Sequence, residues 1–143
     1  MRTTFTFLFF FLLTISANAQ NKFLKDRAQT EQLSKKVAEL FNSNKISESF
    51  QELSSYWPIP ENELEGLEEK TIKYLNLLNE RFGEPIGALK VRTESISDIA
   101  LKETYLVRYQ NSAIRLIFTY YKNSNGWIVN AFKWDDSFTD EFK

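Results

Sequence analysis

The sequence predicts an α+β domain in which N-terminal helices pack on one face of a curved four-stranded antiparallel sheet. Three observations lead to this class. Apolar residues recur at helical spacing as far as Phe82, and after Pro85 they alternate in segments rich in β-branched and aromatic residues. The later segments are joined by turns so short that successive strands must be antiparallel neighbours.

The first helix is expected over residues 26–42, where apolar residues repeat every three or four positions. A shorter stripe at Ile46, Phe50 and Leu53 predicts a second helix. Trp57-Pro58-Ile59-Pro60 then forces an extended connection, because each proline fixes its own φ angle and restricts the residue before it. We expect this segment to plug the junction of two helices; the alternative is a stiff cover over the mouth of a pocket.

A third helix is predicted from Glu61 to Phe82. Its first turns carry five glutamates, which favour the positive end of the helix dipole, and Gly83 followed by Pro85 ends it. We interpret the glutamates as a solvated face rather than a cation site. Four strands are then expected, over residues 88–96, 99–110, 113–123 and 127–135.

The turn between the second and third strands decides which side chains share a face. If Asn111-Ser112 is a two-residue loop, Glu103 lies opposite Tyr120 on the inward face, with Tyr105 two residues away. An even-numbered turn before the last strand adds Trp127, Val129 and Ala131 to that face. The reverse face then holds an apolar set that is unusual for a face left in water: Leu106, Ile117, Tyr121, Ile128, Phe132 and Trp134.

The first 19 residues are typical of a cleaved export signal. They begin with a positive charge at Arg2, continue with an almost wholly apolar run over residues 5–15, and end in the small-x-small pattern Ala17-Asn18-Ala19. The run is too short to span a bilayer, and no second such run follows. We expect cleavage between Ala19 and Gln20 and a soluble single domain, residues 20–143, in the periplasm or outside the cell. The alternative is a short buried N-terminal strand.

Composition excludes several classes of function. The full chain has 18 basic and 19 acidic residues, without the basic surplus of a nucleic-acid-binding protein. It has no cysteine and no histidine, which excludes disulfides, thiolate nucleophiles, Cys/His zinc sites and imidazole bases. No acidic loop with calcium-binding spacing is present. We therefore expect no metal and no cofactor.

The order of the elements resembles the NTF2-like, or cystatin-like, superfamily. The resemblance rests on a helix with Val37, Leu40 and Phe41, the Phe50 to Leu53 segment, a helix closing at Phe82-Gly83, and a sheet ending in Trp127-Ile128-Val129-Asn130. It covers residues 28–143 and is nearest to small exported bacterial domains of unknown function. One departure is that the usual early strand is not evident over residues 46–57, which read as helical. The resemblance implies a cone-shaped fold enclosing a pocket, used by some members for catalysis and by many for binding, and frequent dimerisation through the sheet.

Glu103 is the best candidate for a catalytic base. A ketosteroid-isomerase-like reaction needs a carboxylate in an apolar pocket, where desolvation raises its pKa, and a hydroxyl that holds the developing oxyanion. Tyr120 and Tyr105 are the hydroxyls expected nearby. In the alternative interpretation, Glu103 lies near the strand end, where it reaches water or pairs with Lys122.

Arg108 and Arg115 form a second candidate site. The same register places them opposite one another on the reverse face, where they repel unless an anion such as a carboxylate or phosphate bridges them. Bridging by Glu94, or solvation, is the alternative. The reverse face as a whole is a candidate homodimer interface unless residues 20–25 or 138–142 fold over it.

The residues expected to line a pocket between helices and sheet are Trp57, Tyr74, Glu103, Tyr105, Phe118, Tyr120 and Trp127. We predict a non-enzymatic domain that binds a small apolar or anionic ligand or a partner protein. The alternatives are a cofactor-independent isomerase or lyase that uses Glu103, and a structural envelope protein that dimerises through its sheet.

Overall fold

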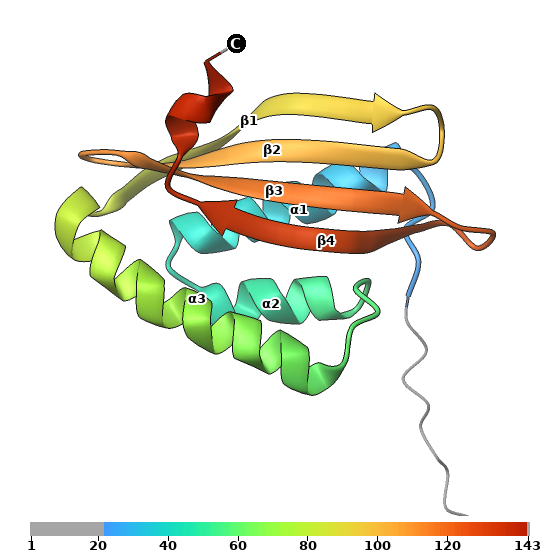
Figure 1. Cartoon of the computed structure of the whole chain (residues 1–143), viewed down its shortest axis with the longest axis horizontal. Coiled ribbons are helices and arrows are strands. Elements are labelled where there is room, and N and C mark those ends of the chain that lie inside the picture. The colour runs from blue at the N-terminus through green and yellow to red at the C-terminus, as the bar shows by residue number, and fades with distance from the viewer. Residues whose placement is uncertain (1–21, 143) are drawn as a thin grey trace, which may run out of the picture.

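A computed structural model describes residues 22–142, and its architecture confirms the predicted α+β class (Figure 1). The helices are α1 (Arg27–Asn42), α2 (Ile46–Ser54) and α3 (Glu61–Phe82). The strands are β1 (Pro85–Ile96), β2 (Ala100–Tyr109), β3 (Ala113–Lys122) and β4 (Trp127–Asp135), followed by the 3-10 helix η1 (Phe138–Glu141). The strands form one open antiparallel sheet in the order β1-β2-β3-β4. The expected leader, its cleavage point and Gln20 lie outside the described residues.

The helices begin and end where local signals predict. The side chain of Asp26 caps α1 by accepting a hydrogen bond of 2.9 Å from the backbone N–H of Gln29. Gly83 ends α3 with a φ of 81°, a conformation that glycine adopts without steric cost. Residues 46–54 form α2, so the helical interpretation of this segment is confirmed.

The connection between α2 and α3 is packed into the structure. Trp57 is buried, and its ring meets the edge of Phe132 at a centroid distance of 6.4 Å. The preceding residue, Tyr56, accepts a backbone hydrogen bond of 2.9 Å from Val129 of β4. The connection therefore joins the helices to the sheet, as the plug interpretation expects.

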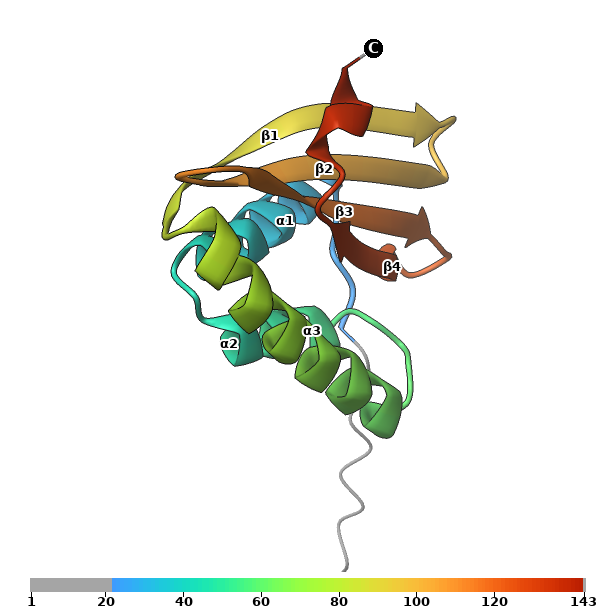
Figure 2. The same ribbon diagram turned by 60° about the vertical axis from the view of Figure 1, so that its left-hand side comes forward.

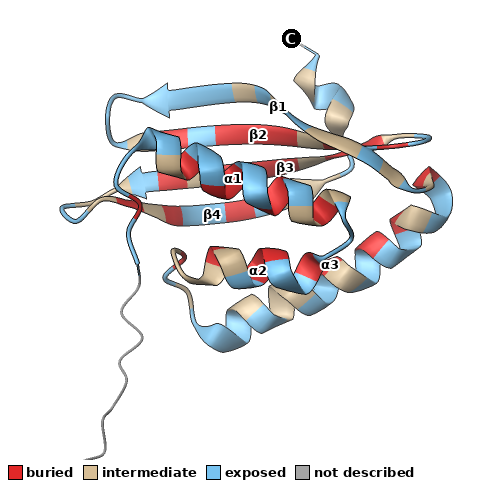
Figure 3. Cartoon of the chain, turned by 180° about the vertical axis from the view of Figure 1, so that it is seen from behind, coloured by how far each residue is buried: buried red, intermediate tan, exposed pale blue. Residues whose placement is uncertain are grey.

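Helix α1 lies across the sheet and packs against β1 and β2, whereas α2 and α3 lie side by side beneath β4 (Figures 1 and 2). The buried side of α1 includes Leu33, Val37 and Phe41. Seen from behind, α1 passes in front of β2 and β3, and buried residues occupy the middle of β2, β3 and β4 (Figure 3). The core thus occupies the space between one face of the sheet, here called the inner face, and the helices.

The hairpin between β2 and β3 turns one residue earlier than expected. Its two-residue loop is Gln110-Asn111, closed by a hydrogen bond of 2.8 Å from the N–H of Tyr109 to the carbonyl of Ser112. Glu103 therefore lies opposite Phe118 rather than Tyr120. Because the pairing is shifted by two residues, every side chain stays on its predicted face. Leu101, Glu103, Tyr105, Val107 and Tyr109 are all buried on the inner face.

A β-bulge at Asn130 overturns the predicted faces of the second half of β4. Val129 pairs with Tyr120, but Ala131 pairs with Thr119, so β4 contains one extra residue at this point. Ala131 consequently points outward and is exposed, whereas Phe132 and Trp134 turn to the inner face. The prediction that Phe132 and Trp134 lie on the reverse face was wrong, because period-two alternation does not continue through a bulge.

Candidate functional site

An open groove of about 550 Å³ lies between α3 and the end of β4, with α2 at its floor. We call it the α3–β4 groove. Its lining consists of apolar and aromatic side chains, one threonine and three lysines: Phe50, Leu67, Lys70, Thr71, Lys73, Tyr74, Leu77, Phe132, Lys133 and Trp134. This volume lies within the range of about 300–1,000 Å³ that is usual for small-molecule sites.

Two local features of the sequence build the groove. On α3, Leu67, Thr71 and Tyr74 follow the helical repeat along one side, so they face the same space. On β4, the bulge at Asn130 turns Phe132 and Trp134 toward that space. The two walls are joined by a hydrogen bond of 3.1 Å from the indole N–H of Trp134 to the hydroxyl of Thr71.

Large apolar side chains of the groove remain accessible to solvent. Tyr74 is 51% exposed and Leu77 is 57% exposed. The ring of Tyr74 lies 5.6 Å, centroid to centroid, from that of Trp134. Apolar surface gathered in a concave region is typical of binding sites, because removing such surface from water is favourable.

A separate polar cluster is sealed between α1 and the inner face of the sheet. Glu103 is 1% exposed, and its carboxylate receives hydrogen bonds from the hydroxyls of Ser34, at 2.5 Å, and Thr30, at 3.4 Å. Ser34 also lies 2.6 Å from the hydroxyl of Tyr120, which donates to the backbone carbonyl of Thr30 at 3.1 Å. Glu103 and Tyr120 are therefore brought together, as predicted, but through Ser34.

Lys90 and Glu31 lie at the rim of this cluster. The ammonium group of Lys90 lies 3.8 Å from Oε1 of Glu103 and 3.4 Å from a carboxylate oxygen of Glu31. The hydroxyl of Tyr105 donates to the backbone carbonyl of Glu31 at 3.5 Å. The nearest cation is thus a lysine from β1 rather than the predicted Lys122, whose partner is Asp98 at 2.6 Å.

Burial raises the pKa of Glu103 above its ordinary value, and the hydrogen bond from Ser34 and the charge of Lys90 oppose that shift. Burial also raises the pKa of Tyr120 and of Tyr105. A raised carboxyl pKa is one property of a catalytic base, but a base must also reach the proton that it removes. The Glu103 oxygens contact α1 residues and Lys90 instead, so this geometry favours a structural role.

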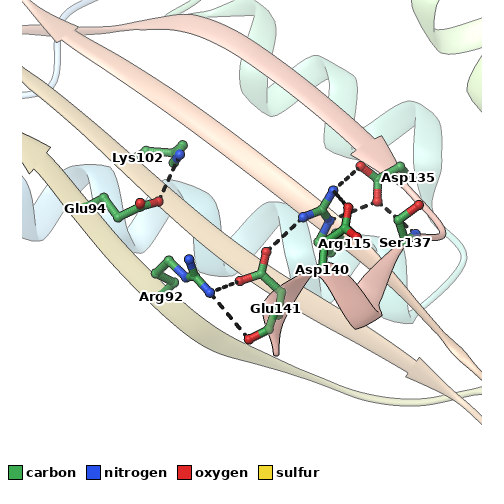
Figure 4. Close-up of polar contacts among 8 residues, drawn as sticks. All are labelled: Arg92, Glu94, Lys102, Arg115, Asp135, Ser137, Asp140 and Glu141. Carbon is green, nitrogen blue, oxygen red and sulfur yellow. Dashed lines mark hydrogen bonds and ion pairs between the residues drawn. The ribbon is translucent and has the colours of Figure 1, made fainter. Parts of the chain in front are cut away.

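The outer face of the sheet carries the second candidate site, and the C-terminal segment covers part of it (Figure 4). Arg115 of β3 binds Asp135 through two hydrogen bonds of 2.9 and 2.7 Å. Its remaining nitrogen donates to Glu141 of η1 at 2.9 Å. The other carboxylate oxygen of Glu141 lies 2.8 Å from Arg92 of β1. Glu141 therefore bridges two strands that are not neighbours in the sheet.

The predicted pairing of Arg108 with Arg115 was wrong. Arg115 lies opposite Leu106, and Arg108 lies opposite Ala113, because the hairpin turns at Gln110-Asn111. The carboxylates that neutralise Arg115 come from Asp135, Asp140 and Glu141 rather than from Glu94, which pairs with Lys102 at 2.9 Å. The structure thus agrees with the alternative in which residues 138–142 fold over part of the outer face.

The other candidates divide between core and surface. Of the seven expected pocket residues, Tyr74 alone lines the α3–β4 groove. Trp57, Phe118 and Trp127 belong to the hydrophobic core, and the guanidinium of Arg27 lies 5.9 Å from the ring centre of Trp127. Among the interface candidates, Ile117 is buried, Leu106 and Ile128 are half-buried, and Tyr121 and Arg108 are exposed.

Sequence reasoning missed most of the groove. The apolar stripe of α3 includes Leu67 but gives no role to Lys70, Thr71, Lys73 and Leu77, although residues 67, 70, 71, 74 and 77 follow a helical repeat. That repeat was the available signal. Thr71 lies on the buried side of α3 with Leu75 and Leu78. The exposed residues Lys70, Tyr74 and Leu77 extend this side toward solvent. The contribution of β4 carried no local signal, because it depends on the bulge.

Together, the fold and this site define an α+β domain with three helices on an open four-stranded sheet and an accessible apolar groove. Comparisons with protein-family models, curated proteins and solved structures find no match to the chain. Within residues 22–142, no helix combines the length and apolar character needed to cross a membrane. The same residues contain no cluster of three or more acidic side chains arranged to hold a metal ion.

Proposed function

We propose that this chain is a non-catalytic binding domain of NTF2-like type that holds a small apolar molecule in the α3–β4 groove. The observation that carries the proposal is the concentration of accessible apolar surface there, above all Tyr74 and Leu77 of α3 beside Trp134 of β4. The walls of the groove are formed without a ligand by α3 and by the bulge in β4, and they are joined by the Trp134–Thr71 hydrogen bond. A preformed site binds more tightly because less ordering accompanies binding.

The chemistry of the remaining candidates supports binding rather than turnover. Lysines are the ionisable groups of the groove besides the phenol of Tyr74, and the carboxylate with a raised pKa lies in the separate cluster under α1. Removing a proton from a ligand in the groove would need a base there, and none of its lining residues is acidic. The groove is therefore suited to hold a molecule without changing it.

A titration with 1-decanol, a neutral apolar probe, tests the proposal. We expect saturable binding that shifts the indole N–H resonance of Trp134 in a ¹H–¹⁵N spectrum, because this group bonds to Thr71 inside the groove. The resonance is assigned with the Trp134→Phe variant. Shifts centred on other parts of the sheet, or no saturable binding, would contradict the proposal.

A matched pair of variants locates the site. Leu77→Gln replaces an apolar wall of the groove at a position that is 57% exposed, so folding should be preserved and decanol affinity should fall by about threefold to tenfold. Leu89→Gln makes the same change on β1 at a position that is 44% exposed and does not line the groove. It should leave decanol affinity unchanged.

We also propose that the chain is exported and cleaved between Ala19 and Gln20. The support is the charged, apolar and small-x-small order of residues 1–19. Intact-mass measurement of the protein from its own host should show the loss of these 19 residues, and an uncleaved mass would refute the proposal.

A further inference from the structure

We propose that the α3–β4 groove selects single-chain amphipathic anions, an inference that rests on the binding function proposed above. The charged residues that line the groove are Lys70 and Lys73 of α3 and Lys133 of β4, and the lining includes no acidic residue. The chain as a whole carries a net charge of −1, so the excess of positive charge among the lining residues is not a property of the whole chain. An apolar groove whose charged lining residues are all positive matches a ligand with an apolar chain and a negatively charged group.

These lysines differ from several others on the surface. Lys36, Lys102 and Lys122 each lie within 2.6 to 2.9 Å of a carboxylate oxygen. Within the part of the chain that the structure describes, no carboxylate lies within ion-pair distance of the ammonium groups of the three groove lysines. Lys133 does lower the pKa of the nearby Asp135 through its charge. Of the three groove lysines, Lys70 and Lys73 are therefore the most available to a ligand.

The positions of Lys70 and Lys73 favour an anion between or beside them. Residues three apart on a helix are neighbours, so these like charges repel each other across one turn of α3. A carboxylate or phosphate group placed near both ammonium groups removes that repulsion. The aliphatic stems of the lysines meanwhile extend the apolar surface formed by Leu67 and Leu77, and only the ammonium groups need to remain in water.

Calorimetric titration with three probes of equal chain length tests the selectivity below micelle-forming concentrations. We expect decanoate to bind about fivefold more tightly than 1-decanol, and decyltrimethylammonium to bind more weakly than 1-decanol. In the Lys70→Gln/Lys73→Gln double variant, the ratio of decanoate affinity to decanol affinity should fall to about one, because glutamine removes the charge and keeps only part of the aliphatic stem. Lys35→Gln/Lys36→Gln removes the same charge from exposed positions of α1 and should keep the advantage.

The possible outcomes separate this inference from the proposed function. Equal affinities for decanoate and decanol would overturn the selectivity and leave groove binding standing. The selectivity is also overturned if the advantage of decanoate survives in Lys70→Gln/Lys73→Gln, or disappears equally in Lys35→Gln/Lys36→Gln. If none of the three probes binds, the proposed function fails as well. Loss of the decanoate advantage in Lys70→Gln/Lys73→Gln alone, with decanol still binding saturably, is the result that supports both.

Discussion

At the scale of single residues, hydrogen bonds from α1 explain how a carboxyl group can be buried under that helix. Three short contacts link Glu103 to Ser34, Ser34 to Tyr120, and Tyr120 to the carbonyl of Thr30. Ser34 donates to the Glu103 carboxylate and Tyr120 donates to the carbonyl of Thr30, while the ammonium group of Lys90 lies 3.8 Å from the carboxylate. These contacts favour the ionised form, but burial outweighs them and raises the pKa of Glu103.

The raised pKa of Glu103 predicts how stability depends on pH. Between the unfolded-state pKa, near 4.5, and the higher folded-state pKa, the folded protein binds more protons than the unfolded protein. The free energy of unfolding contributed by Glu103 should thus be fully present below pH 4.5 and decline as pH rises through the folded-state pKa. Urea denaturation of the wild type and of Glu103→Gln at several pH values measures this difference.

Glu103→Gln is close in shape to the protonated residue and cannot titrate, so its curve should lack this decline. Parallel curves for the two proteins would show that Glu103 is ionised in the fold to the same extent as in the unfolded chain. The Ser34→Ala variant gives a second measure. It leaves the Glu103 carboxyl without its closest partner and should lower the free energy of unfolding by ~1–3 kcal/mol.

At the scale of elements, the helices were predictable because their signals are local. Asp26 caps α1, the two prolines near residue 60 separate α2 from α3, and Gly83 ends α3. Strand positions were also predictable to within three residues at every end. The faces of β4 were not, because the extra residue at Asn130 has no signature in the sequence and inverts every later side chain.

The turn before β4 gives an element-scale prediction. Gly126 has a φ of 145°, and a Cβ atom added there would lie 2.6 Å from the carbonyl oxygen of Leu24. That carbonyl accepts a hydrogen bond of 2.8 Å from the N–H of Trp127, which attaches the segment before α1 to the edge of β4. Gly126→Ala should therefore lower the free energy of unfolding by ~2 kcal/mol, measured by urea denaturation.

Gly66→Ala is the matched control for Gly126→Ala. Gly66 lies inside α3, and a Cβ atom there would meet no atom within 4 Å. Because alanine is the better helix former, this substitution should raise the free energy of unfolding by about 0.5–1 kcal/mol. If Gly126→Ala raised the free energy of unfolding as Gly66→Ala does, the turn would tolerate a Cβ atom at residue 126, and the expected clash with Leu24 would be refuted.

At the scale of the whole molecule, the C-terminal segment connects β1 and β3, two strands that are not neighbours in the sheet. Glu141 is 14% exposed at its side chain and links Arg92 of β1 to Arg115 of β3 across β2 (Figure 4). The hydrogen bonds that Arg115 donates to Asp135 and Glu141 raise its pKa, so the guanidinium stays charged across the ordinary pH range. We expect this cover to stabilise the outer face, because Glu141 neutralises both Arg92 and Arg115.

A double-mutant cycle tests whether Glu141 links Arg92 to Arg115. Removal of residues 137–143 should lower the free energy of unfolding by ~2 kcal/mol, because Arg115 and Arg92 lose Glu141. Arg92→Gln should cost about 1 kcal/mol in the full chain and almost nothing in the shortened chain, since its described partner is then absent. An equal cost in both backgrounds would show that Arg92 acts independently of Glu141.

By itself, the sequence determined the α+β class, the order and limits of the helices and strands, and the inner face of β2 and β3. These depend on apolar periodicity, caps and turn length, which act over a few residues. Tertiary structure alone decided that Phe132 and Trp134 join α3 in a groove, that Ser34 and Thr30 solvate Glu103, and that Glu141 joins two arginines. Each of these depends on residues far apart in the chain or on a one-residue bulge, and no local pattern encodes such contacts.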